Sequence, residues 1–305
     1  MAMGSRRGSA KRATLGVGGR GPGMSRMCSQ VLAEVHRSIL GLLRQITSSA
    51  RVSTLLDVGC WDGGTTIEYA RAAGGARAYG IEVFQDPASQ AAGRGISVAV
   101  MDLERDRFPW ADQSIDLVVC NQVFEHLKNV WLPMSEIARV LRAGGHLVFS
   151  VPNLASLHNR ALLAFGRQPT SIRTFGPHVR GFTLGEVRAF LSAGGIFRIR
   201  RTIGAGFYPL PAAWARPFAA LLPGAAHTSI LWVQKIAHPS QWPWADYAQV
   251  LQATTWTSGT AALSERKPTA SGFSAGILAR RRLSCPMRTV PVRFLEHSPH
   301  NGKKF

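Results

Sequence analysis

Acidic residues are scarce in this sequence, which has 17 Asp and Glu against 36 Lys and Arg and a formal net charge of +19. Such an excess of basic residues is typical of nucleic-acid binding, but most of it lies near the two ends. Residues 1–27 carry six Lys and Arg and no acid, and residues 237–305 carry nine against three acids. Each terminal segment therefore holds a net charge of +6, and the basicity says little about what the region between them binds.

Cysteine is also rare. The four cysteines stand far apart with no Cys-x-x-Cys pair, which gives no support for a zinc site and suits a reducing compartment. No apolar segment follows the basic N-terminus, so the sequence does not predict a secretory signal, and we expect a cytoplasmic protein. The cysteines are Cys28, Cys60, Cys120 and Cys285.

The main glycine-rich loop lacks both common nucleotide-binding patterns, Gly-x-Gly-x-x-Gly and the Gly-Lys-Ser/Thr end of a P-loop. Instead an aliphatic run ends in Asp57, and Gly59, Cys60, Trp61 and Gly63 follow before an amphipathic segment. The pattern predicts a strand, a tight loop and the start of a helix. Such a loop brings backbone N–H groups close to a polar ligand.

Strand and helix patterns alternate along the chain, which predicts parallel βαβ units with helices on both faces of a sheet. An amphipathic helix over 28–48 comes first, and a helix capped by Thr183 with Glu186 runs to about residue 193. Strands are expected at 53–58, 77–83, 96–101, 115–121, 146–151, 196–203 and 228–236, and helices at 63–74, 87–93 and 130–142, the last stopped by Gly144 and Gly145.

These patterns predict one α/β domain at 28–236. We expect a disordered basic extension at 1–27 and a largely disordered basic tail at 237–305, because the tail has no hydrophobic periodicity. The apolar segment 204–227 holds four prolines and one Arg, which argues against a membrane-spanning helix and favours a lid between the last two strands.

Two carboxylates stand at the ends of successive predicted strands, where open α/β sheets bind ligands. Glu82 comes 23 residues after Gly59, and a carboxylate there can accept hydrogen bonds from both ribose hydroxyls of a nucleoside. Asp102 could accept the amino group of adenine while the N–H of Leu103 meets a ring nitrogen. Taken singly, each acid is equally well explained as an ordinary strand end or turn.

The next predicted strand carries the sequence FPWADQSIDLVVCN at 108–121, followed by FEHL at 124–127. Together with the glycine loop and the two acids, it resembles class I S-adenosylmethionine-dependent methyltransferases. The similarity is strongest to the branch that acts on small molecules in polysaccharide and glycolipid pathways. It spans about residues 50–200.

The resemblance implies a Rossmann-like three-layer α/β/α fold, with a seven-stranded, mostly parallel sheet and an antiparallel last strand. It also implies S-adenosylmethionine as the cofactor. One position departs from the pattern, because the family often has Gly where this chain has Trp61. The implied contacts are Asp57 to Gly63 at the methionine portion, Glu82 at the ribose, Asp102 and Leu103 at the adenine, and Asn121 near the reactive methyl.

We expect a methyltransferase whose acceptor is a small molecule, with a sugar hydroxyl as the best guess. An oxygen acceptor benefits from a general base. Segments similar to His178-x-Arg180-x-Phe-Thr occur in methyltransferases encoded with polysaccharide or glycolipid pathways. The candidate catalytic residues are His178, His126, Glu125 and Arg180, with His158 as a weaker candidate, and no metal site is expected.

Three alternatives stay open. An RNA or DNA methyltransferase would suit the charge, but enzymes that methylate base amino groups commonly place Asn/Asp-Pro-Pro-Tyr/Phe after the fourth strand. This chain has Asn121-Gln122-Val123-Phe124 there, so nucleic acid is not the expected partner. A protein that binds the cofactor without turnover would keep the same acids. The segment 206–225 could contact a lipid surface or a lipid-linked acceptor, and the sequence does not set the oligomeric state.

Overall fold

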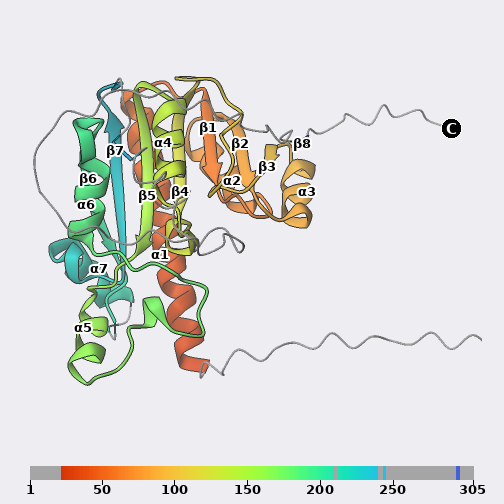
Figure 1. Ribbon diagram of the computed structural model, residues 1–305. Coiled ribbons are helices and arrows are strands. Elements are labelled where there is room, and N and C mark those ends of the chain that lie inside the picture. The colour runs from red at the N-terminus through yellow and green to blue at the C-terminus, as the bar shows by residue number, and fades with distance from the viewer. Residues whose placement is uncertain (1–21, 209, 211, 240–242, 245–292, 296–305) are drawn as a thin grey trace, which may run out of the picture.

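The computed structural model describes residues 22–208, 210, 212–239, 243–244 and 293–295, and these form a three-layer α/β/α fold (Figure 1). The described strands make one sheet in the order β6-β7-β5-β4-β1-β2-β3-β8. They are β1 (Thr54–Val58), β2 (Arg77–Glu82), β3 (Ser97–Val100), β4 (Ile115–Asn121), β5 (Leu141–Pro152), β6 (Phe197–Ala205), β7 (Thr228–Lys235) and β8 (Arg293–Leu295).

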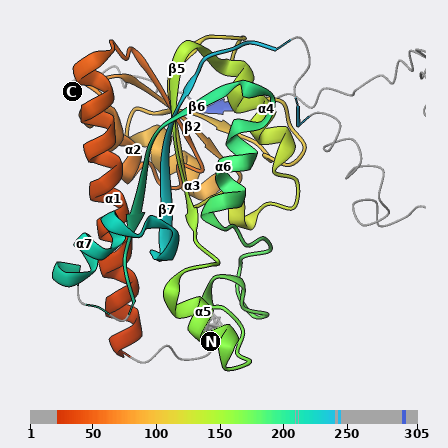
Figure 2. The same cartoon turned by 90° about the vertical axis from the view of Figure 1, so that its left-hand side faces the viewer.

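Helices cover both faces of the sheet, and Figure 2 shows α1 on one side with α4 and α6 on the other. The first layer holds α1 (Pro22–Ser49), α2 (Gly64–Ala72) and α3 (Gln85–Gly93), and the second holds α4 (Trp131–Val140) and α6 (Leu184–Ser192). Two further helices, α5 (Leu157–Ala164) and α7 (Ala212–Leu221), lie toward one end of the sheet (Figure 1). None of the described helices is both long and apolar enough to cross a membrane.

Alternating side chains along each strand build the two cores. In β1, Leu55 packs with residues of α1 and α2, while Leu56 packs with residues of α4 and α6. Both leucines are fully buried. The strands therefore have apolar side chains on both faces, as expected for parallel strands between helical layers.

The parallel pairing sets the position of the candidate site. β1 pairs with β2 and with β4, and β2 pairs with β3, all in parallel. The loops that follow these four strands consequently leave the sheet at the same edge. The first and last of them touch, since a Cβ at Gly59 would lie 2.7 Å from a methyl carbon of Val123.

The predicted fold is confirmed. All seven expected strands are present, and the antiparallel one is β7, which lies between β5 and β6. The predicted cap of α6 is also present, with the Thr183 hydroxyl oxygen accepting a hydrogen bond from the Glu186 N–H at 3.2 Å.

Two predicted boundaries are wrong. α1 begins at Pro22, so the end of the predicted N-terminal extension is helical, and residues 1–21 lie outside the described part of the chain. Helix α4 ends at Val140, and Gly144 and Gly145 lie inside β5 instead of stopping a helix. The reason is that Leu141 already pairs with β4, so the chain enters the sheet directly after the helix.

Most of the predicted tail, 237–305, lies outside the described residues. Beyond residues 237–239, which follow β7 directly, two parts of it are described, and both join the fold. Trp244 is buried and donates its indole N–H to the carbonyl of Phe190 at 3.2 Å. β8 pairs antiparallel with β3 at the edge of the sheet. No periodic pattern in the sequence marks either of them.

Candidate active site

The loop after β1 is a tight turn with three left-handed residues. The φ angles are 80° at Gly59, 50° at Trp61 and 78° at Gly63. Gly63 closes the turn by donating its N–H to the carbonyl of Cys60 at 2.9 Å, and a Cβ at position 63 would lie 2.5 Å from the Ile96 side chain. The left-handed backbone and the lack of room for a Cβ therefore both require glycine at position 63.

Trp61 occupies the position where the resemblance favours Gly, and its left-handed backbone explains that preference. The side chain is 57% exposed and meets the 59% exposed ring of Phe84 edge-on, with ring centroids 6.0 Å apart. Two exposed aromatic rings therefore stand together beside the ends of β1 and β2.

Asp57 lies beneath the loop at the end of β1. Its carboxylate accepts a hydrogen bond from the Thr66 hydroxyl at 2.6 Å, which ties β1 to α2. Burial, opposed in part by that hydrogen bond, raises the pKa of Asp57 to about 7. The contact predicted between Asp57 and the methionine portion remains a prediction.

Glu82 holds the ends of two loops together. One carboxylate oxygen accepts the backbone N–H of Trp61 at 3.0 Å, and the other accepts those of Val83 and Phe84 at 2.9 and 3.0 Å. The oxygen bonded to Trp61 keeps a second lone pair. Glu82 therefore fits its predicted role toward a ribose hydroxyl, and it also has a structural role that the sequence did not reveal.

Cys60 is a predicted cofactor contact whose side chain is buried. It packs with Ala88 and Ile96 beneath the loop, and its N–H donates to the carbonyl of Ile81 at 3.0 Å. Burial raises the pKa of its thiol well above the ordinary range. The side chain therefore packs the loop from below instead of facing a ligand.

Asp102 and Leu103 follow β3 at the same edge of the sheet. The Asp102 carboxylate accepts the N–H of Glu104 at 2.9 Å, and the Leu103 side chain is buried. Glu104 in turn accepts the N–H groups of Lys128 and Asn129 at 3.1 and 3.4 Å. These bonds fix the loop after β3 to the loop after β4.

Asn121 ends β4 within a polar network that the sequence did not predict. Its side-chain oxygen accepts a hydrogen bond from the Ser150 hydroxyl at 2.5 Å, and its amide nitrogen donates to the Tyr69 hydroxyl at 3.2 Å. Ser150 comes from β5 and Tyr69 from α2, and neither belongs to a motif. Only their placement on elements that flank β4 brings them to Asn121.

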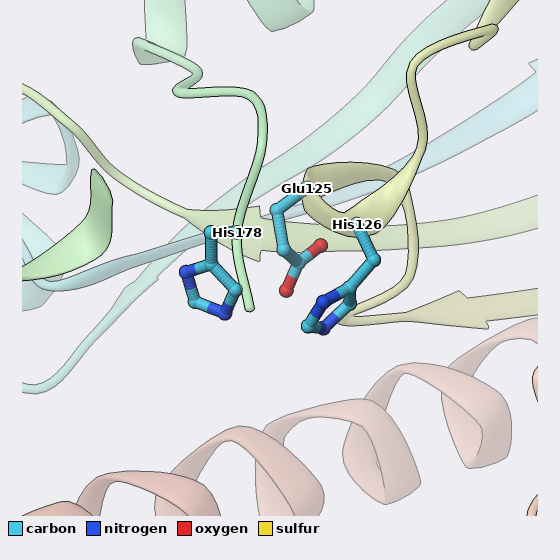
Figure 3. A group of neighbouring side chains, drawn as sticks. All are labelled: Glu125, His126 and His178. Carbon is cyan, nitrogen blue, oxygen red and sulfur yellow. The ribbon is translucent and has the colours of Figure 1, made fainter. Parts of the chain in front are cut away.

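Glu125, His126 and His178 lie side by side (Figure 3). The first two belong to the short 3-10 helix η1 (Phe124–His126) after β4, and His178 lies in the loop before α6. One donor atom from each residue lies within 4.8 Å of the other two, and the two imidazole rings meet edge-on with centroids 4.8 Å apart. The structure thus brings together three of the four predicted catalytic residues, which we call the Glu–His–His cluster.

Glu125 is the unusual member of this cluster. It is 1% exposed, and neither carboxylate oxygen has a hydrogen-bond partner among the described residues. Burial raises its pKa to about 8. A buried polar group without partners is costly, so such a group is a sign of function.

Arg180 and His158 lie outside the cluster. The Arg180 guanidinium stands over the Trp131 ring, 5.2 Å from the centroid, and donates to the carbonyl of Lys128 at 2.8 Å. His158 bonds to the hydroxyl of Thr170 at 2.7 Å and stacks on the ring of His227. The structure gives both side chains packing partners of their own.

Comparison with known proteins agrees with this geometry. The family described as "Methyltransferase domain" matches residues 56–149. A probable S-adenosylmethionine-dependent methyltransferase of Mycolicibacterium smegmatis is 31% identical over 145 residues, which cover 43% of this chain and 52% of that protein. An uncharacterized methyltransferase of a Mycobacterium species is 34% identical over 102 residues, 32% of this chain and 38% of that protein. The chain therefore spans about half, or less, of the length of these relatives.

The family match includes the ends of β1, β2, β3 and β4, where the site residues lie. Residues 56–149 are therefore similar to a methyltransferase domain. The predicted cofactor, S-adenosylmethionine, is a nucleoside joined to an amino acid. The residues present fit such a group, because the glycine loop, the lone pair of Glu82 and the loop at Asp102 share one edge of the sheet. Among solved structures, a methyltransferase of Mesorhizobium loti aligns 96% of its length with 64% of this chain, at 19% identity and a TM-score of 0.44.

Proposed function

We propose that this chain transfers the methyl group of S-adenosylmethionine to a hydroxyl oxygen of a small molecule, a sugar or a related metabolite, held at the Glu–His–His cluster. The position of the cluster supports this proposal. It begins two residues after Val123, whose side chain lies against Gly59 of the cofactor loop. An acceptor at the cluster would therefore meet the cofactor at the edge of the sheet where β1 and β4 end.

When bound, the cofactor supplies an electrophilic methyl group on a sulfonium. The residues of the chain then have two tasks. They align the acceptor oxygen with that methyl group, for which positioning alone can lower the barrier by several kcal/mol. They also assist the loss of the hydroxyl proton, which is worth roughly 10²–10⁴-fold in rate. The two imidazoles and the carboxylate of the cluster are the groups suited to the second task.

The test is a product mass spectrum. The purified chain is incubated with S-adenosylmethionine labelled in its methyl group and with a metabolite extract. We expect one small molecule to gain a single labelled methyl group. Label in bulk RNA or DNA would contradict the proposal, as would slow loss of label to water with no methylated product.

We further propose that α7 contacts a lipid surface or the lipid part of an acceptor. Ala215 and Ala219 on its inner face are buried with Phe207, yet Trp214 and Leu221 on the opposite face are 68% and 78% exposed. A helix that is apolar on both faces leaves one of them without a partner. The test is co-sedimentation with liposomes, where the double variant Trp214→Ala/Leu221→Ala should sediment less than the parent. Equal sedimentation would contradict the contact.

A further inference from the structure

We infer that the Glu–His–His cluster binds a divalent transition-metal cation. Two imidazoles and one carboxylate form the ligand set, and three protein ligands leave coordination positions open for an acceptor oxygen. The cation's role in catalysis rests on the proposed methyl transfer, whereas its binding does not.

The spacing of the donor atoms supports a shared cation. Donor atoms that bind one cation at about 2.1 Å lie about 3–4 Å apart. The three donor atoms of the cluster all lie within 4.8 Å of one another. Small side-chain movements therefore suffice to bring them to coordination distance, and the side chains already face one another (Figure 3).

The backbone fixes the histidine tautomers that a cation requires. The Nδ1 atom of His178 lies 2.7 Å from the carbonyl oxygen of Ser171, and that of His126 lies 3.3 Å from the carbonyl oxygen of Pro177. Because a carbonyl oxygen only accepts hydrogen bonds, each Nδ1 carries the proton, and a neutral ring has its lone pair on Nε2. Metal-binding histidines are oriented by this kind of hydrogen bond to a carbonyl group.

Glu125 provides an independent observation. Its carboxylate is almost completely buried, faces the two histidines, and has no hydrogen-bond partner among the described residues. A buried carboxyl group is ordinarily hydrogen-bonded, paired with a charge or bound to a metal ion. No Lys ammonium or Arg guanidinium forms an ion pair with Glu125 in the described part of the chain, so a cation at the cluster would supply the missing partner.

In the reaction, the cation would bind the acceptor hydroxyl oxygen and lower its pKa, as metal ions do for bound water. The O–H bond breaks, and the proton passes to solvent water. The oxygen lone pair then forms the bond to the methyl carbon while the methyl–sulfur bond breaks, and that electron pair stays on sulfur. No oxidant or reductant is needed.

The test is cation binding to the untagged full chain after removal of metal with a chelator. Calorimetry with Mn²⁺ should show one equivalent bound, and Co²⁺ should give a ligand-field absorption band that Zn²⁺ removes. Glu125→Gln and His178→Ala should each weaken binding at least tenfold. His158→Ala is the matched control, since His158 has partners outside the cluster, and it should bind as the parent does. Thermal stabilisation by S-adenosylmethionine shows that each variant is folded.

The absence of binding at millimolar cation would overturn the inference, as would equal binding by the parent and both cluster variants. The proposed function is tested separately. If the chelated parent transfers methyl groups at the full rate while the cluster variants do not, the cation is excluded from the reaction and the methyl transfer stands. If the cation binds and no acceptor is methylated, the cation site stands and the proposed function fails.

Discussion

The backbone of Val179 donates its N–H to the carbonyl oxygen of Glu125 at 2.9 Å. This bond joins the loop before α6 to η1, which follows β4 more than fifty residues earlier in the chain. The N–H of Arg180 adds a second bond to the same oxygen at 3.2 Å. Together with the contact between His126 and the carbonyl of Pro177, it places His178 beside Glu125 and His126 (Figure 3).

Val179→Pro should therefore impair catalysis without impairing cofactor binding. Proline has no N–H to donate and also restricts the residue before it, which is His178. Because small errors in position can cost on the order of 10²-fold in rate, we expect a large fall in kcat. Val179→Ala keeps the N–H and should stay within a few-fold of the parent. Equal rates for the two variants in a methyl-transfer assay would show that this bond does not position the cluster.

Gly63→Ala should destabilise the chain more than Gly74→Ala. Both glycines have a φ of 78°, but a Cβ at Gly63 would meet Ile96 at 2.5 Å, whereas one at Gly74 meets nothing within 4 Å. Left-handed strain costs each variant about 1–2 kcal/mol, and overpacking adds about 1–3 kcal/mol at position 63 alone. Urea unfolding measures the difference. Gly63→Ala should also lose the thermal stabilisation that S-adenosylmethionine gives the parent. If the two variants lose the same free energy of unfolding, a Cβ at position 63 is not crowded by Ile96.

Asp57→Asn should change how stability depends on pH. The folded pKa of about 7 exceeds the unfolded value of 3.8. At a pH between these two values, Asp57 is therefore protonated in the native state and ionised in the unfolded state. The contribution of Asp57 to stability is therefore fully present at low pH and falls as pH rises toward 7. Asn can still accept the hydrogen bond from Thr66 and does not titrate. We expect the stability of the variant relative to the parent to rise from pH 5 to pH 8 in thermal unfolding, and a constant difference would exclude a raised pKa.

Trp61→Gly should weaken cofactor binding without lowering stability. Relief of the left-handed backbone gains about 1–3 kcal/mol, and the greater freedom of glycine in the unfolded chain costs about 0.5–1 kcal/mol. If the Trp61 and Phe84 rings cover the cofactor, Phe84→Ala should raise the Kd for S-adenosylmethionine to a similar extent, because it removes the other ring of the pair. Calorimetry on both variants gives the comparison. If both variants bind S-adenosylmethionine as tightly as the parent, neither ring contributes to the cofactor site.

The sequence predicts those parts of the molecule that follow from local pattern. Alternating strands and helices, the cap at Thr183 and the acids at Glu82 and Asp102 are local, and the structure places all of them at the expected elements. The contacts of Ser150 and Tyr69 with Asn121 could not be predicted, because they depend on which elements become neighbours. The burial of Glu125 and the packing of Arg180 on Trp131 arise in the same way, from the loop before α6 folding over the end of β4.

The most direct test compares cofactor binding with methyl transfer in His178→Ala. The predicted cofactor contacts lie at the ends of β1, β2, β3 and β4, whereas His178 lies in the loop before α6, within the Glu–His–His cluster. We predict that the Kd for S-adenosylmethionine stays within twofold of the parent while transfer of the labelled methyl group to the acceptor is lost. Unchanged transfer in the variant, with the cofactor bound as tightly as in the parent, would contradict a catalytic role for the cluster.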